Sequence, residues 1–164
     1  MRVKVPLLAI LDRDGVLNVD KGHVHRYADF EWQQDAKLAV RWLNEKGYTV
    51  VVATNQSGIG RGLYTRHDFC ALTKVMLLEA ELDGGTIAGV YHCPHTPEYG
   101  CHCRKPETGM LEQVVRDWGG YERTFLLGDK GSDMEAAKRF GMQGYLFTGG
   151  SLLKFMMEKV KEGV

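Results

Sequence analysis

The stretch Leu11-Asp12-Arg13-Asp14-Gly15-Val16-Leu17-Asn18 decides how the rest of the chain is organised. It follows an apolar run, Pro6 to Leu11, that is typical of a buried parallel strand. Side chains two residues apart share one face of an extended segment, so Asp12 and Asp14 are expected to point into the same space. Ligands of open α/β sheets bind at this end of a strand, and two adjacent carboxylates need a cation or a shared proton. The stretch therefore predicts a divalent metal site with an acid/base partner.

The composition is that of one globular domain spanning residues 1–164, with 44% hydrophobic and 26% charged residues. Its 21 basic and 21 acidic residues cancel, which argues against nucleic acid as a partner. No apolar run approaches the roughly 20 residues of a membrane span. Residues 1–6 lack a signal-peptide pattern. We therefore expect a cytoplasmic protein with no membrane partner, and take a monomer as the default.

Strand-like and helix-like segments alternate along the chain, without internal repeats or linkers. Strands are predicted at residues 6–11, 48–53, 87–92, 124–127 and 143–147. Helices are predicted at residues 35–46, 65–82, 108–118, 132–140 and from 151 onward. Thr65 with Asp68, and Ser132 with Glu135, match the capping-box pattern. The alternation predicts an α/β fold, a three-layer doubly wound parallel sheet with right-handed crossovers.

Polar side chains occur where four of the predicted strands end. They are Asp12 and Asp14, Thr54 and Asn55, Arg104 and Lys105, and Asp129 and Asp133. Each group has an ordinary explanation when taken alone, such as a polar turn, surface charges or helix capping. Because the carboxyl ends of parallel strands meet at one edge of a sheet, the groups together predict an active site.

These residue types suit the handling of a phosphoryl group. The carboxylates of Asp12 and Asp14 offer a nucleophile and a general acid/base. Thr54 and Asn55 offer hydrogen bonds to phosphate oxygens. Lys105 offers a compact cation for a phosphoryl group. Arg104 offers a planar guanidinium group that can donate paired hydrogen bonds to a second anion.

A second cluster of metal-ligand side chains lies in the segment of residues 93–103. Cys93, His95, Cys101 and Cys103 form a Cys₃His set, which suits a structural tetrahedral zinc ion. His92 and His102 are competing ligands, and unrelated thiols or a catalytic zinc are the alternatives. The remaining cysteine, Cys70, is expected to be a core thiol on the apolar face of a helix.

The motifs together resemble those of the haloacid dehalogenase (HAD) superfamily phosphatases. The matching segments are Asp12-Arg-Asp-Gly-Val-Leu-Asn, Thr54-Asn-Gln-Ser-Gly, Arg104-Lys-Pro and Gly128-Asp-Lys-x-x-Asp133. Longer segments, at residues 18–25, 54–62 and 93–106, are similar to the heptose bisphosphate phosphatases of this superfamily. The histidinol-phosphate phosphatases share the cysteine loop and most of the motifs, so that alternative stays open.

The resemblance implies a Mg²⁺-dependent phosphatase that works through a phosphoaspartate. Asp12 would attack phosphorus, and Asp14 would protonate the leaving oxygen and then activate water. Thr54 and Lys105 would steady the transferring group. The resemblance also implies that Mg²⁺ is held by Asp12, the backbone carbonyl of Asp14, and Asp129, with Asp133 behind them.

For the substrate, the resemblance implies a small phosphorylated sugar, a heptose 1,7-bisphosphate that loses its 7-phosphate. The pathway would lead to ADP- or GDP-heptose and lipopolysaccharide or other surface glycans. The implied substrate-binding residues are Asp20, Lys21, Gly22, His23, Asn55, Gln56, Ser57, Arg104 and Lys130. Insertions between the motifs are only helix-sized, so the fold is expected to be capless. A non-catalytic zinc-stabilised binding module is a third reading, and the intact set of acidic residues with Lys105 argues against it.

Overall fold

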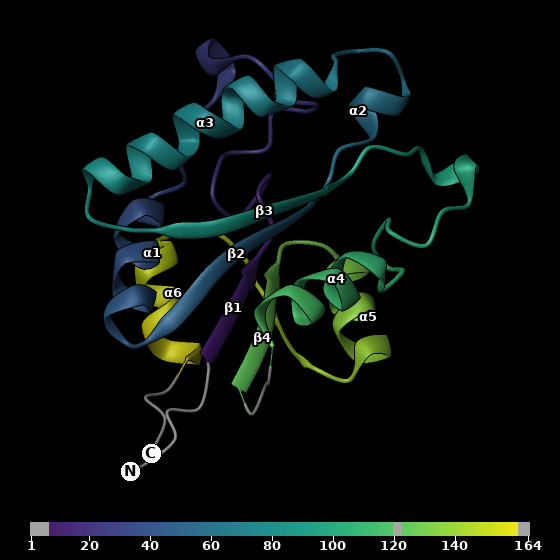
Figure 1. The fold of residues 1–164 in the computed structure, drawn as a ribbon. Coiled ribbons are helices and arrows are strands. Elements are labelled where there is room, and N and C mark those ends of the chain that lie inside the picture. The colour runs from purple at the N-terminus through teal and green to yellow at the C-terminus, as the bar shows by residue number, and fades with distance from the viewer. Residues whose placement is uncertain (1–6, 120–122, 161–164) are drawn as a thin grey trace.

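The computed structural model describes residues 7–119 and 123–160. These residues form a five-stranded parallel sheet in the order β3-β2-β1-β4-β5 (Figure 1). The strands are β1 (Leu7–Leu11), β2 (Tyr48–Asn55), β3 (Ile87–Cys93), β4 (Arg123–Gly128) and β5 (Gln143–Leu146). The predicted α/β class and the parallel sheet are confirmed. Pro6, at the start of the first predicted strand, lies outside the described residues.

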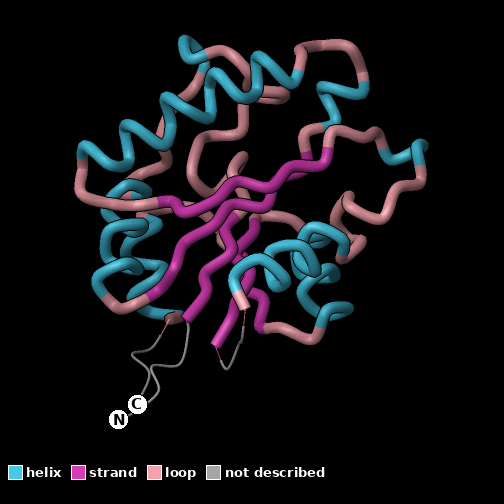
Figure 2. Tube along the Cα trace, viewed as in Figure 1, coloured by secondary structure: helices cyan, strands magenta, loops and turns pink. Residues whose placement is uncertain are grey.

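Helices cover both faces of the sheet. They are α1 (Ala36–Glu45), α2 (Ser57–Gly60), α3 (Arg66–Leu82), α4 (Gly109–Trp118), α5 (Gly131–Phe140) and α6 (Leu152–Lys159). One hydrophobic cluster joins the sheet to α1, α3 and α6, and a second joins it to α4 and α5. Figure 2 shows the strands between these two groups of helices. The arrangement is the expected three-layer, doubly wound fold.

The central strand β1 is buried on both faces. Ala9 and Leu11 belong to the cluster with α1, α3 and α6, whereas Leu8 and Ile10 belong to the cluster with α4 and α5. All four side chains are at most 2% exposed. Because β1 lies between β2 and β4, residues that follow Leu11 emerge at the middle of the carboxyl edge of the sheet.

Two predicted helix starts have different outcomes. The Thr65 capping box is confirmed: the backbone N–H of Asp68 donates to Thr65 Oγ1 (3.1 Å), and the N–H of Thr65 donates to Asp68 Oδ2 (2.9 Å). The capping box of Ser132 with Glu135 is wrong, because α5 begins at Gly131. The acceptor is Asp133, whose Oδ2 receives the backbone N–H of Lys130 (3.1 Å).

Cys70 lies on α3 but is exposed, so its prediction as a core thiol is wrong. The buried residues of α3 are Phe69, Leu72, Met76 and Ala80. They recur at three- and four-residue spacing, and this stripe turns the neighbouring Cys70 toward solvent.

The loops at the carboxyl edge carry little secondary structure of their own. Residues 12–35 contain one short 3₁₀ turn (Tyr27–Asp29), and the segment after β3 contains another (Pro97–Tyr99). These loops and α2 are the only insertions among the described residues at this edge, which is the expected capless form. None of the described helices has the length and apolar character to cross a membrane.

Candidate active site

Three carboxylates gather where β1 and β4 end. Asp12 follows β1, Asp129 follows β4, and Asp133 lies in the first turn of α5. One oxygen from each lies within 4.8 Å of the others. Asp129 Oδ1 is buried and has no hydrogen-bond partner among the described residues. Carboxylate oxygens are the ligands that Mg²⁺ prefers, so this donor set fits the ion.

Two glycines allow the backbone to approach these carboxylates. Gly15 has a φ of +88°, and a Cβ on it would lie 2.0 Å from Asp129 Oδ2. A Cβ on Gly128 would lie 2.2 Å from the Cγ of Asp133. A larger residue at either position would therefore displace a carboxylate of the candidate metal site.

Lys105 is the cation of this cluster and is only 2% exposed. Its Nζ lies 3.2 Å from Asp12 Oδ1 and 2.6 Å from Asp133 Oδ1, and it donates to the carbonyl oxygen of Ala53 (2.8 Å). Burial alone would lower the pKa of Lys105, but the two carboxylates raise it above its usual value. The side chain therefore stays charged beside Asp12.

Burial raises the pKa of Asp12 to about 7, and the carboxylates of Asp133, Asp14 and Asp129 add to this rise. Lys105 acts in the opposite direction. Burial also raises the pKa of Asp129. Carboxylates this close together are difficult to keep ionised unless a further cation binds beside them. The raised pKa values are therefore a second indication of a metal site.

Asn55 fixes the segment that carries Lys105. Its side-chain Nδ2 donates to the carbonyl oxygen of Lys105 (3.1 Å), and the backbone N–H of Lys105 donates to Asn55 Oδ1 (3.0 Å). These paired bonds join the end of β2 to the segment of residues 104–106. Asn55 also lines the cleft, as its predicted contact with substrate requires.

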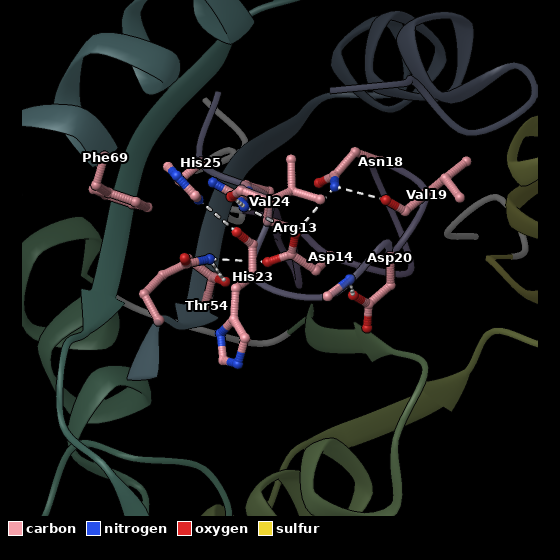
Figure 3. A network of polar contacts seen from close by, with 12 residues as sticks. Arg13, Asp14, Asn18, Val19, Asp20, His23, Val24, His25, Thr54 and Phe69 are labelled. Carbon is pink, nitrogen blue, oxygen red and sulfur yellow. Dashed lines mark hydrogen bonds and ion pairs between the residues drawn. The ribbon is translucent and has the colours of Figure 1, made fainter. Parts of the chain in front are cut away.

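The carboxylate of Asp14 accepts hydrogen bonds on both oxygens (Figure 3). Arg13 Nη2 (2.8 Å) and Asn18 Nδ2 (3.0 Å) donate to Oδ1. Gln56 Nε2 donates to Oδ2 (2.9 Å). The sequence predicts Asp14 at the site as the proton carrier, but it assigns no role to Arg13 or Asn18.

Gln56 is 3% exposed and its amide is engaged by protein groups. Besides Asp14, its Nε2 donates to Thr54 Oγ1 (2.9 Å), and its Oε1 accepts the hydroxyl of Tyr64. Burial raises the pKa of Tyr64 to about 12, so this hydroxyl keeps its proton at neutral pH. Tyr64 is a further residue of the cleft that the sequence did not predict, since it lies in the connection between α2 and α3 with no motif to mark it.

These side chains border a cleft of about 230 Å³. Its lining is Asp12, Asp14, Asp20, Gly22, His23, Asn55, Gln56, Ser57, Tyr64, Arg104, Lys105, Lys130, Ser132 and Asp133. Asp20 and Lys130 come from different loops and form an ion pair (3.5 Å). Lys21, predicted at the sugar side, is absent from this lining and pairs with Glu31 (3.1 Å).

The cysteine loop forms a separate cluster. The ligand atoms of Cys93, His95, Cys101 and Cys103 all lie within 4.8 Å of one another, with Cys93 Sγ 3.5 Å from Cys101 Sγ. Tetrahedral zinc with bonds of about 2.3 Å separates two sulfurs by roughly 3.7 Å. Cys103 Sγ also lies 3.5 Å from Cys101 Sγ, close to this value, whereas the Sγ atoms of Cys93 and Cys103 lie closer together, at 2.8 Å. The donor set fits zinc.

The two competing histidines have other contacts. His102 is exposed, and its Nε2 lies 2.7 Å from Glu112 Oε2. His92 packs on the ring of Phe69, with centroids 4.4 Å apart. His95 instead lies within the cysteine cluster, where its ring stacks on Tyr99 at 4.2 Å.

A family profile described as HAD-hydrolase-like matches residues 102–162. That segment contains Lys105, Asp129 and Asp133, and the fold brings it against Asp12 at the end of β1. The parallel sheet, the paired aspartates and this match are features of the HAD-like hydrolases.

Relatives narrow the class further. The D-glycero-β-D-manno-heptose-1,7-bisphosphate 7-phosphatase of Haemophilus ducreyi is 40% identical over 81% of this chain and 78% of its own length. The corresponding α-anomer phosphatase of Photorhabdus laumondii is 34% identical over 82% and 78%. The chain therefore belongs to the D-glycero-D-manno-heptose-1,7-bisphosphate 7-phosphatase family.

A solved structure supports the same placement. The D,D-heptose 1,7-bisphosphate phosphatase of B. bronchiseptica, complexed with magnesium and phosphate, superposes with a TM-score of 0.82 at 32% identity. The match covers 93% of this chain and 86% of that one. The relative binds its metal and phosphate on the same fold.

Proposed function

We propose that this protein removes the 7-phosphate of D-glycero-D-manno-heptose 1,7-bisphosphate in a Mg²⁺-dependent reaction. The product would serve the synthesis of ADP- or GDP-heptose for surface glycans such as lipopolysaccharide. The observation that carries the proposal is a single cleft with two sets of cations. Lys105 lies beside the carboxylate of Asp12. Arg104 and Lys130, which pairs with Asp20, line the same cleft and supply positive charge for a second phosphate.

In this proposal Asp12 attacks the 7-phosphorus and forms a phosphoaspartate. The buried ammonium group of Lys105, 3.2 Å from Asp12 Oδ1, offsets negative charge on the transferring group. The hydroxyl of Thr54, which the amide of Gln56 holds in place, is the further predicted contact to that group.

Asp14 is the proposed proton carrier. It donates a proton to the sugar oxygen as the bond from that oxygen to phosphorus breaks. It then takes a proton from the water that attacks the phosphoaspartate, which restores Asp12 as a carboxylate. Its place two residues after Asp12, in the lining of the same cleft, supports both steps.

We propose that Mg²⁺ is held by Asp12, Asp129 and the backbone carbonyl of Asp14. When bound, the ion neutralises charge on the phosphoryl oxygens. Asp133 would stand behind the ligands, because its Oδ1 pairs with Lys105 (2.6 Å) and its Oδ2 accepts the N–H of Lys130.

Mg²⁺ is expected to stabilise the protein more at about pH 8 than at about pH 5.5. The pKa of Asp12 is raised to about 7 in the folded, metal-free protein, above its unfolded value of about 3.9. The stability that this group contributes is therefore present at low pH and lost as the pH rises toward 7. At 100 times its Kd, Mg²⁺ adds about 2.7 kcal/mol where Asp12 is ionised, and less where a proton competes.

Thermal unfolding with Mg²⁺ or EDTA at the two pH values measures this difference. Asp12→Asn is the control, and its response to Mg²⁺ should be small and similar at both pH values. An equal gain at both pH values in the wild type would contradict the assignment of Asp12 as a ligand.

Arg104→Met is expected to lower kcat/KM for the heptose bisphosphate about 10- to 100-fold, mainly through KM. Arg104 lines the cleft, and its Nη1 has no hydrogen-bond partner among the described residues, so the N–H groups of Nη1 are available to a second phosphate. The rate with p-nitrophenyl phosphate, which has no second phosphate, should change little. Arg116→Met, an exposed position on α4, is the control. Equal losses on both substrates would contradict this role.

We also propose that Cys93, His95, Cys101 and Cys103 hold a structural zinc ion. The cluster leads directly into Arg104 and Lys105, and its three cysteines pack with the hydrophobic cluster of α4 and α5. Zinc would therefore fix the backbone that presents both cations to the cleft.

The alternative is a histidinol-phosphate phosphatase. Histidinol phosphate would bring an ammonium group toward Arg104 and Lys130, whereas a bisphosphate brings an anion, so charge favours the bisphosphate. Phosphate release from both compounds, with Mg²⁺ or EDTA, tests the choice. Faster turnover of histidinol phosphate would overturn the proposed substrate, and no release from any phosphomonoester would favour a binding module.

We further propose a cytoplasmic monomer, which gel filtration and cell fractionation would test.

A further inference from the structure

Arg13, between the two aspartates of the site, is a buried cation with an incomplete set of partners. Its side chain is 1% exposed. Nη2 donates to Asp14 Oδ1 (2.8 Å) and to the carbonyl oxygen of Val24 (2.6 Å). Nε and Nη1 have no partner in the described chain, and Cζ lies 5.8 Å from the ring centroid of Phe69. Burying such a group costs stability, so packing alone does not account for an arginine here.

The second acceptor of Arg13 belongs to the turn that lines the cleft. Val24 directly follows Gly22 and His23, which both border the cleft. His23 has a φ of +47°, a conformation uncommon for a residue with a side chain. The ring Nδ1 of His25 lies 2.8 Å from the carbonyl oxygen of His23 (Figure 3). Arg13, through the carbonyl oxygen of Val24, and His25, through that of His23, therefore hold the turn in this unusual backbone conformation.

A second route joins the same turn to the other oxygen of Asp14. The ring of His25 stacks on Tyr64, with centroids 4.7 Å apart and an interplanar angle of 8°. Tyr64 donates its hydroxyl to Gln56, which in turn donates to Asp14 Oδ2. Arg13 and the Tyr64–Gln56 pair thus connect residues 23–25 to both oxygens of one carboxylate.

We propose that Arg13 is a positioning residue that locks the Asp14 carboxylate and the turn at residues 22–24 into one arrangement. The inference rests on the proposed function, because it concerns how Asp14 transfers its proton. Oδ1 accepts two hydrogen bonds, from Arg13 and Asn18, whereas Oδ2 accepts one, from Gln56. Oδ2 therefore keeps a lone pair that can carry the proton. That proton moves from Oδ2 to the sugar oxygen as the phosphorus–oxygen bond breaks, and Oδ2 later receives one from the attacking water.

Two substrates separate a positioning role from a structural one. The leaving p-nitrophenolate needs no proton, whereas a sugar alkoxide does, and hydrolysis of the phosphoaspartate needs Asp14 as a base in both cases. In Arg13→Met, kcat on the heptose bisphosphate is expected to fall about 100-fold. The same variant should release p-nitrophenol in a burst followed by slow turnover. Arg13→Lys keeps the charge but is one bond shorter, so it should recover part of the loss.

Arg139→Lys is the matched control for Arg13→Lys, since Arg139 is exposed on α5 and forms ion pairs with Glu107 and Glu135. It should behave as the wild type. A merely structural role of Arg13 would lower both reactions in proportion to lost folded protein, without a burst.

If Arg13→Met does not fold, Arg13→Lys and Tyr64→Phe decide the matter. Tyr64→Phe keeps the ring that stacks on His25 and removes the hydroxyl that holds Gln56, and about a 10-fold loss with the same burst is expected. Tyr27→Phe, at an exposed hydroxyl, is its control. Folded variants with wild-type kcat on the heptose bisphosphate would overturn the positioning role alone. A wild-type protein that releases no phosphate would instead overturn the proposed function.

Discussion

Asp12→Asn is expected to lower Mg²⁺-dependent phosphate release by at least about 10⁴-fold. The amide is a poor nucleophile, so no phosphoaspartate forms, and it is a weaker partner for both Mg²⁺ and Lys105. Binding of substrate through Arg104 and Lys130 should persist, so the loss should appear in kcat. Steady-state phosphate release, with mass spectrometry of acid-quenched protein to detect a phosphoryl group on Asp12, measures both effects.

The same variant is expected to fold at least as stably as the metal-free wild type near neutral pH. It removes a carboxylate whose pKa is raised by burial and by neighbouring acids, while Lys105 keeps its contact with Asp133 (2.6 Å). Asp83→Asn, at an exposed acid at the C-terminal end of α3, is the control for the loss of one charge. Activity of Asp12→Asn within 10-fold of the wild type would rule out Asp12 as the nucleophile.

Cys101→Ala is expected to abolish zinc binding and to destabilise the protein by at least about 3 kcal/mol. For a chain of this size the loss corresponds to a drop in Tm of roughly 6–12 °C. Loss of the ion frees the loop that leads into Arg104 and Lys105, so activity should fall as well. Elemental analysis should find about one zinc per wild-type chain and none in the variant.

Cys70→Ala is the matched control, because Cys70 is an exposed thiol on α3 outside the cluster. It should leave the zinc content and the Tm nearly unchanged. A wild-type protein without zinc that still unfolds on loss of Cys101 would show that the thiols stabilise the loop by packing alone.

The fold could be predicted because its main determinants are local and periodic. The four residues Leu8 to Leu11 are apolar without alternation, and in the structure both faces of β1 are covered. The start of α5 was placed one residue late, because Ser132 and Glu135 match a capping box and Lys130 is an unusual N-cap residue. Helix ends depend on such single contacts, and the periodic pattern does not contain them.

The main groups of the candidate site were also predictable, since they follow strands that end at one edge. Arg13, however, was missed for a geometric reason. In a continuing strand it would point away from Asp12 and Asp14. Instead the chain turns at once, and the carbonyl oxygen of Arg13 accepts the backbone N–H groups of Val16, Leu17 and Asn18. This turn brings the guanidinium back to Asp14, and no spacing rule for strands predicts it.

The fate of each phosphorus atom tests the central proposal most directly. ³¹P NMR of D-glycero-D-manno-heptose 1,7-bisphosphate with the wild-type protein and Mg²⁺ distinguishes the two phosphates by their resonances. We predict that the C7 phosphate signal is replaced by that of inorganic phosphate while the C1 signal remains, and that Asp12→Asn shows neither change. Loss of the C1 phosphate, or no reaction under conditions where histidinol phosphate is hydrolysed, would contradict the account.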